Sequence, residues 1–143
     1  MEALMHLLRN PAVVRICRAV IGIIFAAAGL AKIGDMEAFA QSIHNFRIVP
    51  IALENVVAIT LPWIEVVIAL ALILGIRARA GAWLATGLLA VFTVAIVTAV
   101  VRDLDIACGC FGTDDAARTG WTKVLENVGM TAVGVVACLR PRS

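Results

Sequence analysis

Four long apolar stretches, separated by polar residues, glycine or proline, limit this chain to a small set of folds. A helix of about 20 apolar residues crosses the hydrocarbon core of a membrane. Of the 143 residues, 62% are hydrophobic and only 15% are charged. A transmembrane β-barrel would need segments of alternating polarity, which these stretches lack. We therefore predict an all-α integral membrane four-helix bundle, a single domain over residues 1–143. Its spans are approximately residues 13–33, 56–74, 81–101 and 121–139.

The interval between the first two spans predicts an amphipathic helix on the outer membrane surface. Asp35 precedes it as a candidate N-cap, and Pro50 is expected to interrupt it. Pro62 is expected near the start of the second span, where its missing N–H costs little. The apolar residues that recur at helical spacing in this interval are Met36, Phe39, Ile43 and Phe46.

The basic residues predict the orientation in the membrane, because cytoplasmic loops carry an excess of Lys and Arg. If both termini and the turn after the second span are cytoplasmic, seven basic residues lie inside and five outside. We therefore predict a multi-pass protein of the bacterial plasma membrane, with both termini cytoplasmic and the loop after the third span extracytoplasmic. The inner set is Arg9, Arg15, Arg18, Arg77, Arg79, Arg140 and Arg142, and the outer set is Lys32, Arg47, Arg102, Arg118 and Lys123.

A pair of cysteines, Cys108 and Cys110, lies in this extracytoplasmic loop with Gly109 between them. Two cysteines form a disulfide only when their Cα atoms come within about 7 Å, and glycine permits the necessary bend. A ring this small is strained, and strain makes a disulfide easier to reduce and exchange. Disulfides persist on the extracytoplasmic side of the membrane. The motif therefore favours thiol redox chemistry or soft-metal binding.

Two further cysteines, Cys17 and Cys138, lie inside apolar stretches. A lone cysteine in such a setting behaves as a small hydrophobic residue. We expect both to be packing residues.

Three charged residues lie near the outer ends of the spans: Lys32, Glu65 and Glu126. Charges within a span usually face the bundle interior or a cavity. Lys32 is a candidate to stabilise a cysteine thiolate, and Glu65 a candidate to accept the thiol proton. The alternatives are a Lys32–Glu65 ion pair that only joins two helices, or a lysine whose ammonium reaches the membrane interface.

An ordered series of short motifs resembles the MauE branch of the DoxX-like membrane proteins. The resemblance implies a four-helix membrane protein associated with thiol redox. The namesake of the branch is linked, in methylamine utilisation, to processing of a disulfide-rich dehydrogenase subunit beside a thioredoxin-like partner. Other DoxX-like proteins are associated with sulfur oxidation and quinone-linked electron transfer. The matching residues are Phe25, Ala28 to Ile33, Asp35, Pro50, Leu61 to Glu65, Gly75, Arg77 and Cys108 to Gly112.

Three functions remain open at this point. In the first, Cys108 and Cys110 exchange electrons with a thioredoxin-like partner or a disulfide-containing client, and the chain acts as a thiol–disulfide oxidoreductase. A quinone would supply or drain the electrons, since an apolar bundle with a polar outer mouth would hold one. In the second, the two thiolates bind Cu(I), Zn or Hg(II). In the third, they form a static disulfide in a non-catalytic subunit. Nucleic acid is not an expected partner, because the chain has no strongly basic face.

Overall fold

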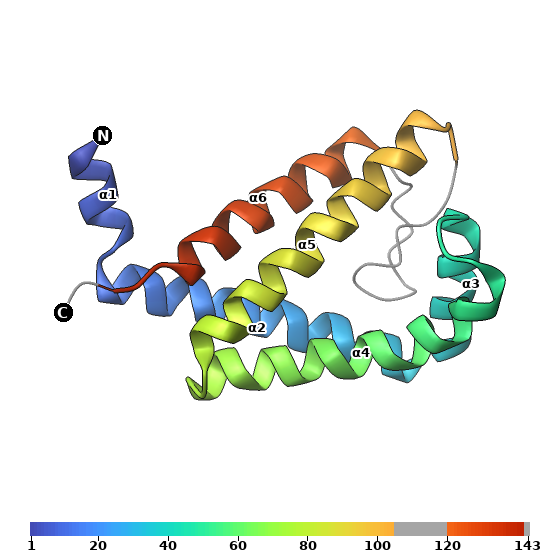
Figure 1. The fold of residues 1–143 in the computed structure, drawn as a ribbon, viewed down its shortest axis with the longest axis horizontal. Helices are drawn as coiled ribbons and strands as arrows, with labels where there is room; N and C mark the ends of the chain where they lie inside the picture. The colour runs from blue at the N-terminus through green and yellow to red at the C-terminus, as the bar shows by residue number, and fades with distance from the viewer. Residues whose placement is uncertain (105–119, 142–143) are drawn as a thin grey trace.

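The computed structural model describes residues 1–104 and 120–141, and all regular secondary structure within them is helical (Figure 1). This confirms the all-helical prediction. The structure also adds a short helix at the N-terminus that the sequence analysis does not predict. The six helices are α1 (Glu2–Leu8), α2 (Pro11–Gly34), α3 (Met36–Phe46), α4 (Ile51–Leu74), α5 (Ala78–Val101) and α6 (Trp121–Cys138).

Three helices, α2, α4 and α5, are long and apolar enough to cross a membrane. Each has 24 residues, which at about 1.5 Å per residue exceeds the hydrocarbon core of about 30 Å. The chain is therefore a multi-pass membrane protein. Among the described helices, α6 does not reach the same apolarity, because Lys123, Glu126 and Asn127 lie in its first two turns.

The second span begins earlier than the sequence predicts. Helix α4 starts at Ile51 rather than near residue 56, and Pro50 is its N-cap with φ −57°. That φ is already close to the helical value, so the helix can start directly after the proline. The expected place of Pro62 is consequently wrong, since this residue lies inside α4 and not near its start.

Helix α2 packs along α4 and α6, and α5 packs along the same two helices (Figure 1). Two glycines allow the close approach of α2 to α4. A Cβ atom on Gly22 would lie 2.9 Å from Cγ1 of Ile73, and one on Gly29 would lie 3.0 Å from the carbonyl oxygen of Pro62. Small residues at such contacts let helix backbones approach closely in a membrane. The α2–α4 contact therefore depends on glycine.

The two cysteines outside the loop motif belong to the main apolar core. Cys138 is buried in that core and Cys17 packs against it, and neither forms a disulfide within the described residues. The sulfur of Cys138 also lies 3.5 Å from the hydroxyl oxygen of Thr86. The predicted packing role of both cysteines is confirmed.

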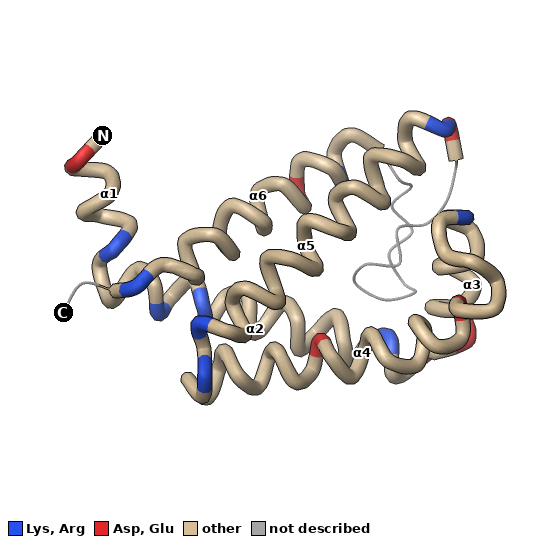
Figure 2. Tube along the Cα trace, in the orientation of Figure 1, with Lys and Arg blue, Asp and Glu red and all other residues tan. Residues whose placement is uncertain are grey.

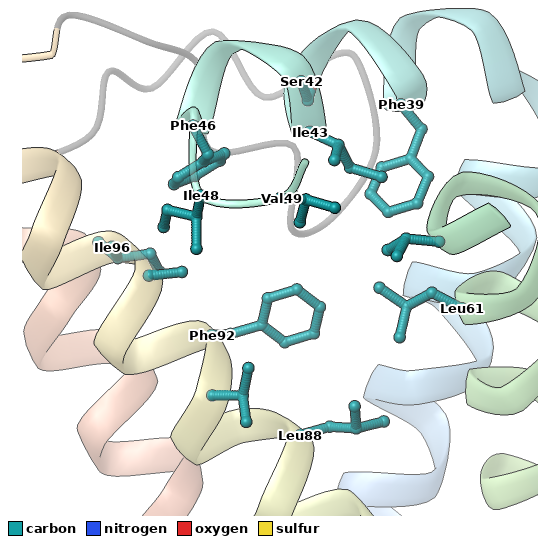
Figure 3. Close-up of a pocket in the computed structure, with 13 residues that line it drawn as sticks. Phe39, Ser42, Ile43, Phe46, Ile48, Val49, Leu61, Leu88, Phe92 and Ile96 are labelled. Atoms are coloured by element: carbon teal, nitrogen blue, oxygen red, sulfur yellow. The ribbon is translucent and has the colours of Figure 1, made fainter. Parts of the chain in front are cut away.

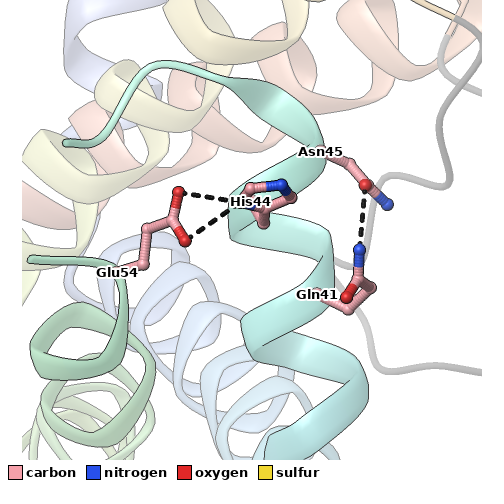
Figure 4. A network of polar contacts seen from close by, with 4 residues as sticks. All are labelled: Gln41, His44, Asn45 and Glu54. Atoms are coloured by element: carbon pink, nitrogen blue, oxygen red, sulfur yellow. Dashed lines mark hydrogen bonds and ion pairs between the residues drawn. The ribbon is translucent and has the colours of Figure 1, made fainter. Parts of the chain in front are cut away.

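Helix α3 connects two candidate spans and lies at one end of the molecule (Figure 1). The side chain of Asp35 accepts a hydrogen bond from the backbone N–H of Ala38, as predicted for an N-cap. Phe39 and Ile43 are buried against Ala58 of α4. A polar side of α3 also contacts α4, through the side chain of His44, whose Nδ1 atom lies 3.1 and 3.2 Å from the carboxylate oxygens of Glu54 (Figure 4).

Both termini and the α4–α5 turn lie at the other end of the molecule, where basic residues gather (Figure 2). Arg18 of α2 also contributes to the packing there. Its guanidinium donates hydrogen bonds to the carbonyl oxygens of Ala137 and Leu139, at 2.9 and 3.4 Å. A cation at this position satisfies carbonyls left free at the C-terminal end of α6.

Candidate functional site

The structure brings Lys32 and Glu65 together in the interior. Lys32 lies in the last turn of α2, and Glu65 lies in α4. The ammonium of Lys32 donates to both carboxylate oxygens of Glu65, at 2.7 and 2.9 Å. The two residues are only 1% and 2% exposed. They form the ion pair that the sequence analysis considered as one alternative.

Gly29 sets the position of this pair. It lies almost one turn before Lys32 on the face of α2 that meets α4, and a Cβ atom there would lie 3.3 Å from Cβ of Glu65. Any larger residue would push the helices apart just where the carboxylate lies. The close approach of α2 and α4 therefore brings the ammonium within reach of both carboxylate oxygens.

Two aromatic rings cover the remaining sides of the ammonium. The Nζ atom of Lys32 lies 5.3 Å from the ring centroid of Phe39 in α3 and 5.4 Å from that of Phe92 in α5. A cation within about 6 Å of a ring centroid is attracted by the ring's negative face. Lys32 is thus held by side chains from three other helices.

The carboxylate of Glu65 faces a small cavity that it shares with Asn127 of α6. The cavity has a volume of about 20 Å³. Asn127 is 4% exposed, and its Oδ1 atom has no hydrogen-bond partner among the described residues. The lining of the cavity is mostly apolar, with Glu65 and Asn127 as its polar members. The site therefore brings polar groups from α2, α4 and α6 to one place.

Glu126, which the sequence analysis considers beside Lys32 and Glu65, is not part of this site. Its side chain is 48% exposed and accepts a hydrogen bond from Lys123 at 3.2 Å, so it does not face the interior. The next residue, Asn127, does. The buried positions of α6 include Val124, Asn127 and Gly134. Their spacing places them on one face of a helix, and this pattern is the sequence signal that Asn127 faces inward.

The other two predicted site residues, Cys108 and Cys110, lie outside the described residues. Their relation to Lys32 and Glu65 stays a prediction. What the structure provides is the buried pair, its aromatic surroundings and the neighbouring asparagine.

Comparison with known proteins places the chain in a family. Residues 10–140 match the family described as methylamine utilisation protein MauE. The chain belongs to the MauE family. MauE of Paracoccus denitrificans is 34% identical over 127 residues, covering 88% of this chain and 68% of that relative. MauE of Methylorubrum extorquens is 36% identical over 128 residues, covering 89% and 69%. No solved structure matches the chain.

The MauE match includes Lys32, Glu65 and the Cys108–Cys110 motif, and it extends from the start of α2 to the end of α6. MauE of Methylophilus methylotrophus, at 26% identity, aligns over 94% of this chain. The family predicted from the motifs is therefore confirmed at the level of MauE, whereas the wider DoxX-like grouping stays a prediction.

Proposed function

We propose that this chain is an accessory membrane protein of methylamine utilisation that performs thiol–disulfide exchange through Cys108 and Cys110. The observation that carries the proposal is the family match over residues 10–140, which includes both cysteines. The relatives in that family are named for methylamine utilisation. A cysteine pair separated by one glycine supplies the chemistry.

The proposed topology has four spans, with α6 as the fourth and α3 lying on the extracytoplasmic surface. Packing of α6 along α2 and α5 supports a fourth span, because its polar residue Asn127 is buried inside the molecule. The basic residues at the end that holds both termini support a cytoplasmic location for that end (Figure 2). This orientation puts the cysteine loop outside the cytoplasm.

The exchange proceeds through a mixed disulfide. The thiolate of one cysteine attacks a client disulfide, forms a bond to one client sulfur and releases the other as a thiolate. The second cysteine then attacks the mixed disulfide, which frees the reduced client and leaves Cys108 and Cys110 joined. Two electrons have moved to the client. The dithiol of a thioredoxin-like partner restores the pair by the same two steps, and client oxidation runs the sequence in reverse.

Lys32 and Glu65 have direct roles in this proposal, as stabiliser of the thiolate and acceptor of its proton. Their support is a charged pair in the membrane interior, where charge is costly and is usually retained for function. The small cavity beside Glu65 gives its carboxylate a polar neighbour in α6.

A non-catalytic subunit is the second candidate, and one observation favours it. Lys32 and Glu65 bind each other through two hydrogen bonds and are almost fully buried, which suits a purely structural link between α2 and α4. In this case Cys108 and Cys110 would form a static disulfide.

Trapping separates the two candidates. The Cys110→Ser variant, expressed in cells that grow on methylamine, should accumulate a mixed disulfide between Cys108 and a partner, visible as a reducible band of higher mass. The Cys138→Ser variant is the matched control, because Cys138 is buried in the apolar core. Absence of any mixed disulfide from both Cys108→Ser and Cys110→Ser, with a wild-type disulfide that resists strong reductant, would favour the non-catalytic subunit.

A further inference from the structure

A cavity of about 310 Å³ lies beneath α3, between α4 and α5 (Figure 3). Its walls are almost entirely apolar and include the rings of Phe39, Phe46 and Phe92. The hydroxyl of Ser42, which also lines it, already donates to the carbonyl oxygen of Ala38 at 3.0 Å. Cavities that bind small molecules begin at about 300 Å³. This one offers space to a hydrocarbon group and little to a polar solute.

The cavity continues onto the outer side of α5. A second hollow of about 360 Å³ shares Ile48, Val91 and Ala95 with it. Val91 and Val94 in this hollow are 65% and 66% exposed, on a helix apolar enough to cross a membrane. Side chains exposed on such a helix face lipid. The cavity therefore opens toward the bilayer.

The depth of the cavity matches one membrane leaflet. Its lining on α5 runs from Leu88 to Ile96, a rise of about 12 Å at 1.5 Å per residue. Half of a hydrocarbon core of about 30 Å is about 15 Å. An acyl chain that enters from the α3 end would lie along most of its leaflet.

A cation lies between two of the lining residues in the sequence. Arg47 is exposed and follows directly after Phe46, with Ile48 on its other side, and both of these residues line the cavity. Its φ of 50° is in the left-handed region, which ends α3 at this point. An exposed arginine next to two lining residues suits the phosphate of a lipid whose acyl chain occupies the cavity, because basic side chains at the membrane surface attract anionic headgroups.

We propose that this cavity binds one acyl chain of an anionic phospholipid, with the headgroup phosphate held by Arg47. Lys32 is not one of the residues that line this cavity, and its ammonium donates to the carboxylate of Glu65. The inference rests on the membrane location and not on exchange at Cys108 and Cys110.

Native mass spectrometry of the delipidated full chain tests the proposal, with added phosphatidylglycerol, phosphatidylcholine or ubiquinone. The wild-type protein should retain one phosphatidylglycerol in preference to phosphatidylcholine. Val91→Trp, which fills the shared wall of the two hollows, should abolish retention. The control Leu84→Trp should behave as wild type, because Leu84 is 60% exposed on the same helix and lines neither hollow. Ala95→Trp provides a second filling variant.

Arg47→Gln tests the headgroup separately and leaves the cavity intact. It should lower the preference for phosphatidylglycerol over phosphatidylcholine about fivefold, the effect of one basic residue near a membrane surface. Equal binding of the two lipids to the wild-type protein would overturn the headgroup assignment. Retention unchanged in both filling variants, or displacement of phosphatidylglycerol by ubiquinone, would overturn the acyl-chain assignment.

Discussion

Within the described residues, two contacts between a basic side chain and a carboxylate join α4 to its neighbours, and they lie in opposite surroundings. Lys32 and Glu65 connect α2 to α4 with side chains that are 1% and 3% exposed. His44 and Glu54 connect α3 to α4 at 3.1 Å, with side chains that are 53% and 13% exposed (Figure 4). The contacts look alike in distance but differ in what happens when one partner is removed. A buried charge left alone is costly, whereas an exposed one is solvated by water.

The largest effect is expected from Glu65→Leu, which leaves the ammonium of Lys32 buried without its carboxylate. We expect a loss of about 3–5 kcal/mol in the free energy of unfolding, measured by denaturant titration in detergent micelles. The double variant Lys32→Met/Glu65→Leu should recover most of this loss, since it removes both charges. A single variant as stable as the wild type would show that the pair is not the link between α2 and α4.

The same double variant sharpens the functional question. If Lys32 and Glu65 only join helices, it should trap as much mixed disulfide as wild type in the Cys110→Ser background. If they stabilise the thiolate and accept its proton, trapping should fall although stability is restored.

The next effect concerns Gly29, which lets the buried pair form. Gly29→Ala puts a Cβ atom 3.0 Å from the carbonyl oxygen of Pro62, and overpacking of this kind costs about 1–3 kcal/mol. Gly87→Ala is the matched control, because a Cβ atom there meets nothing within 4 Å. The control should gain up to about 1 kcal/mol from helix propensity. Equal stabilities in thermal unfolding of the two variants would contradict the close contact.

Arg18 makes a partly buried contact, with a burial between that of the Lys32–Glu65 pair and that of the His44–Glu54 pair. Arg18→Met removes two hydrogen bonds to the C-terminal carbonyls of α6, and we expect a loss of about 1–2 kcal/mol. Arg15→Met, on the exposed side of the same helix, should change stability by less than about 0.5 kcal/mol. Denaturant titration of both variants measures the difference, and a larger loss at Arg15 would be inconsistent with this packing.

The smallest effect is expected from the exposed pair. His44→Ala should lower the free energy of unfolding by less than about 1 kcal/mol. High salt should weaken any charge–charge part of this contact, because charges are screened beyond about 3 Å at about 1 M salt. Gln41→Ala, near His44 on α3, controls for the loss of a polar side chain, since Gln41 donates to Asn45 of the same helix at 3.2 Å. A loss as large as that of Glu65→Leu would remove the distinction between the two pairs.

The sequence predicts the helices well because apolar length and capping residues are local signals. Three apolar spans, the cap at Asp35 and the core positions of Cys17 and Cys138 follow from short stretches of chain. Local signals also explain the wrong position predicted for Pro62. Proline is favoured in the first turn of a helix, so the sequence suggests a start near Pro62, whereas the helix already starts after Pro50.

Contacts between helices are less accessible from the sequence. A Lys32–Glu65 pair could be anticipated, because isolated charges in apolar stretches need partners. Which side of α6 faces that pair depends on the packing of the whole helix, so the charge of Glu126 draws attention in the sequence although its neighbour Asn127 is the buried residue. Neither the rings of Phe39 and Phe92 around the ammonium nor the cavity beneath α3 follows from periodicity, because each combines residues from separate helices.

The buried pair also has a consequence for biogenesis. Helix α2 leaves the ribosome before α4, so the charge on Lys32 reaches the translocon ahead of its partner. A charged side chain is costly to insert into a membrane, and before Glu65 arrives the ammonium of Lys32, in the last turn of α2, can be solvated only by reaching the membrane surface. Release of α2 into lipid is therefore most favourable once α4 has arrived, and the first two spans should enter the bilayer as a hairpin.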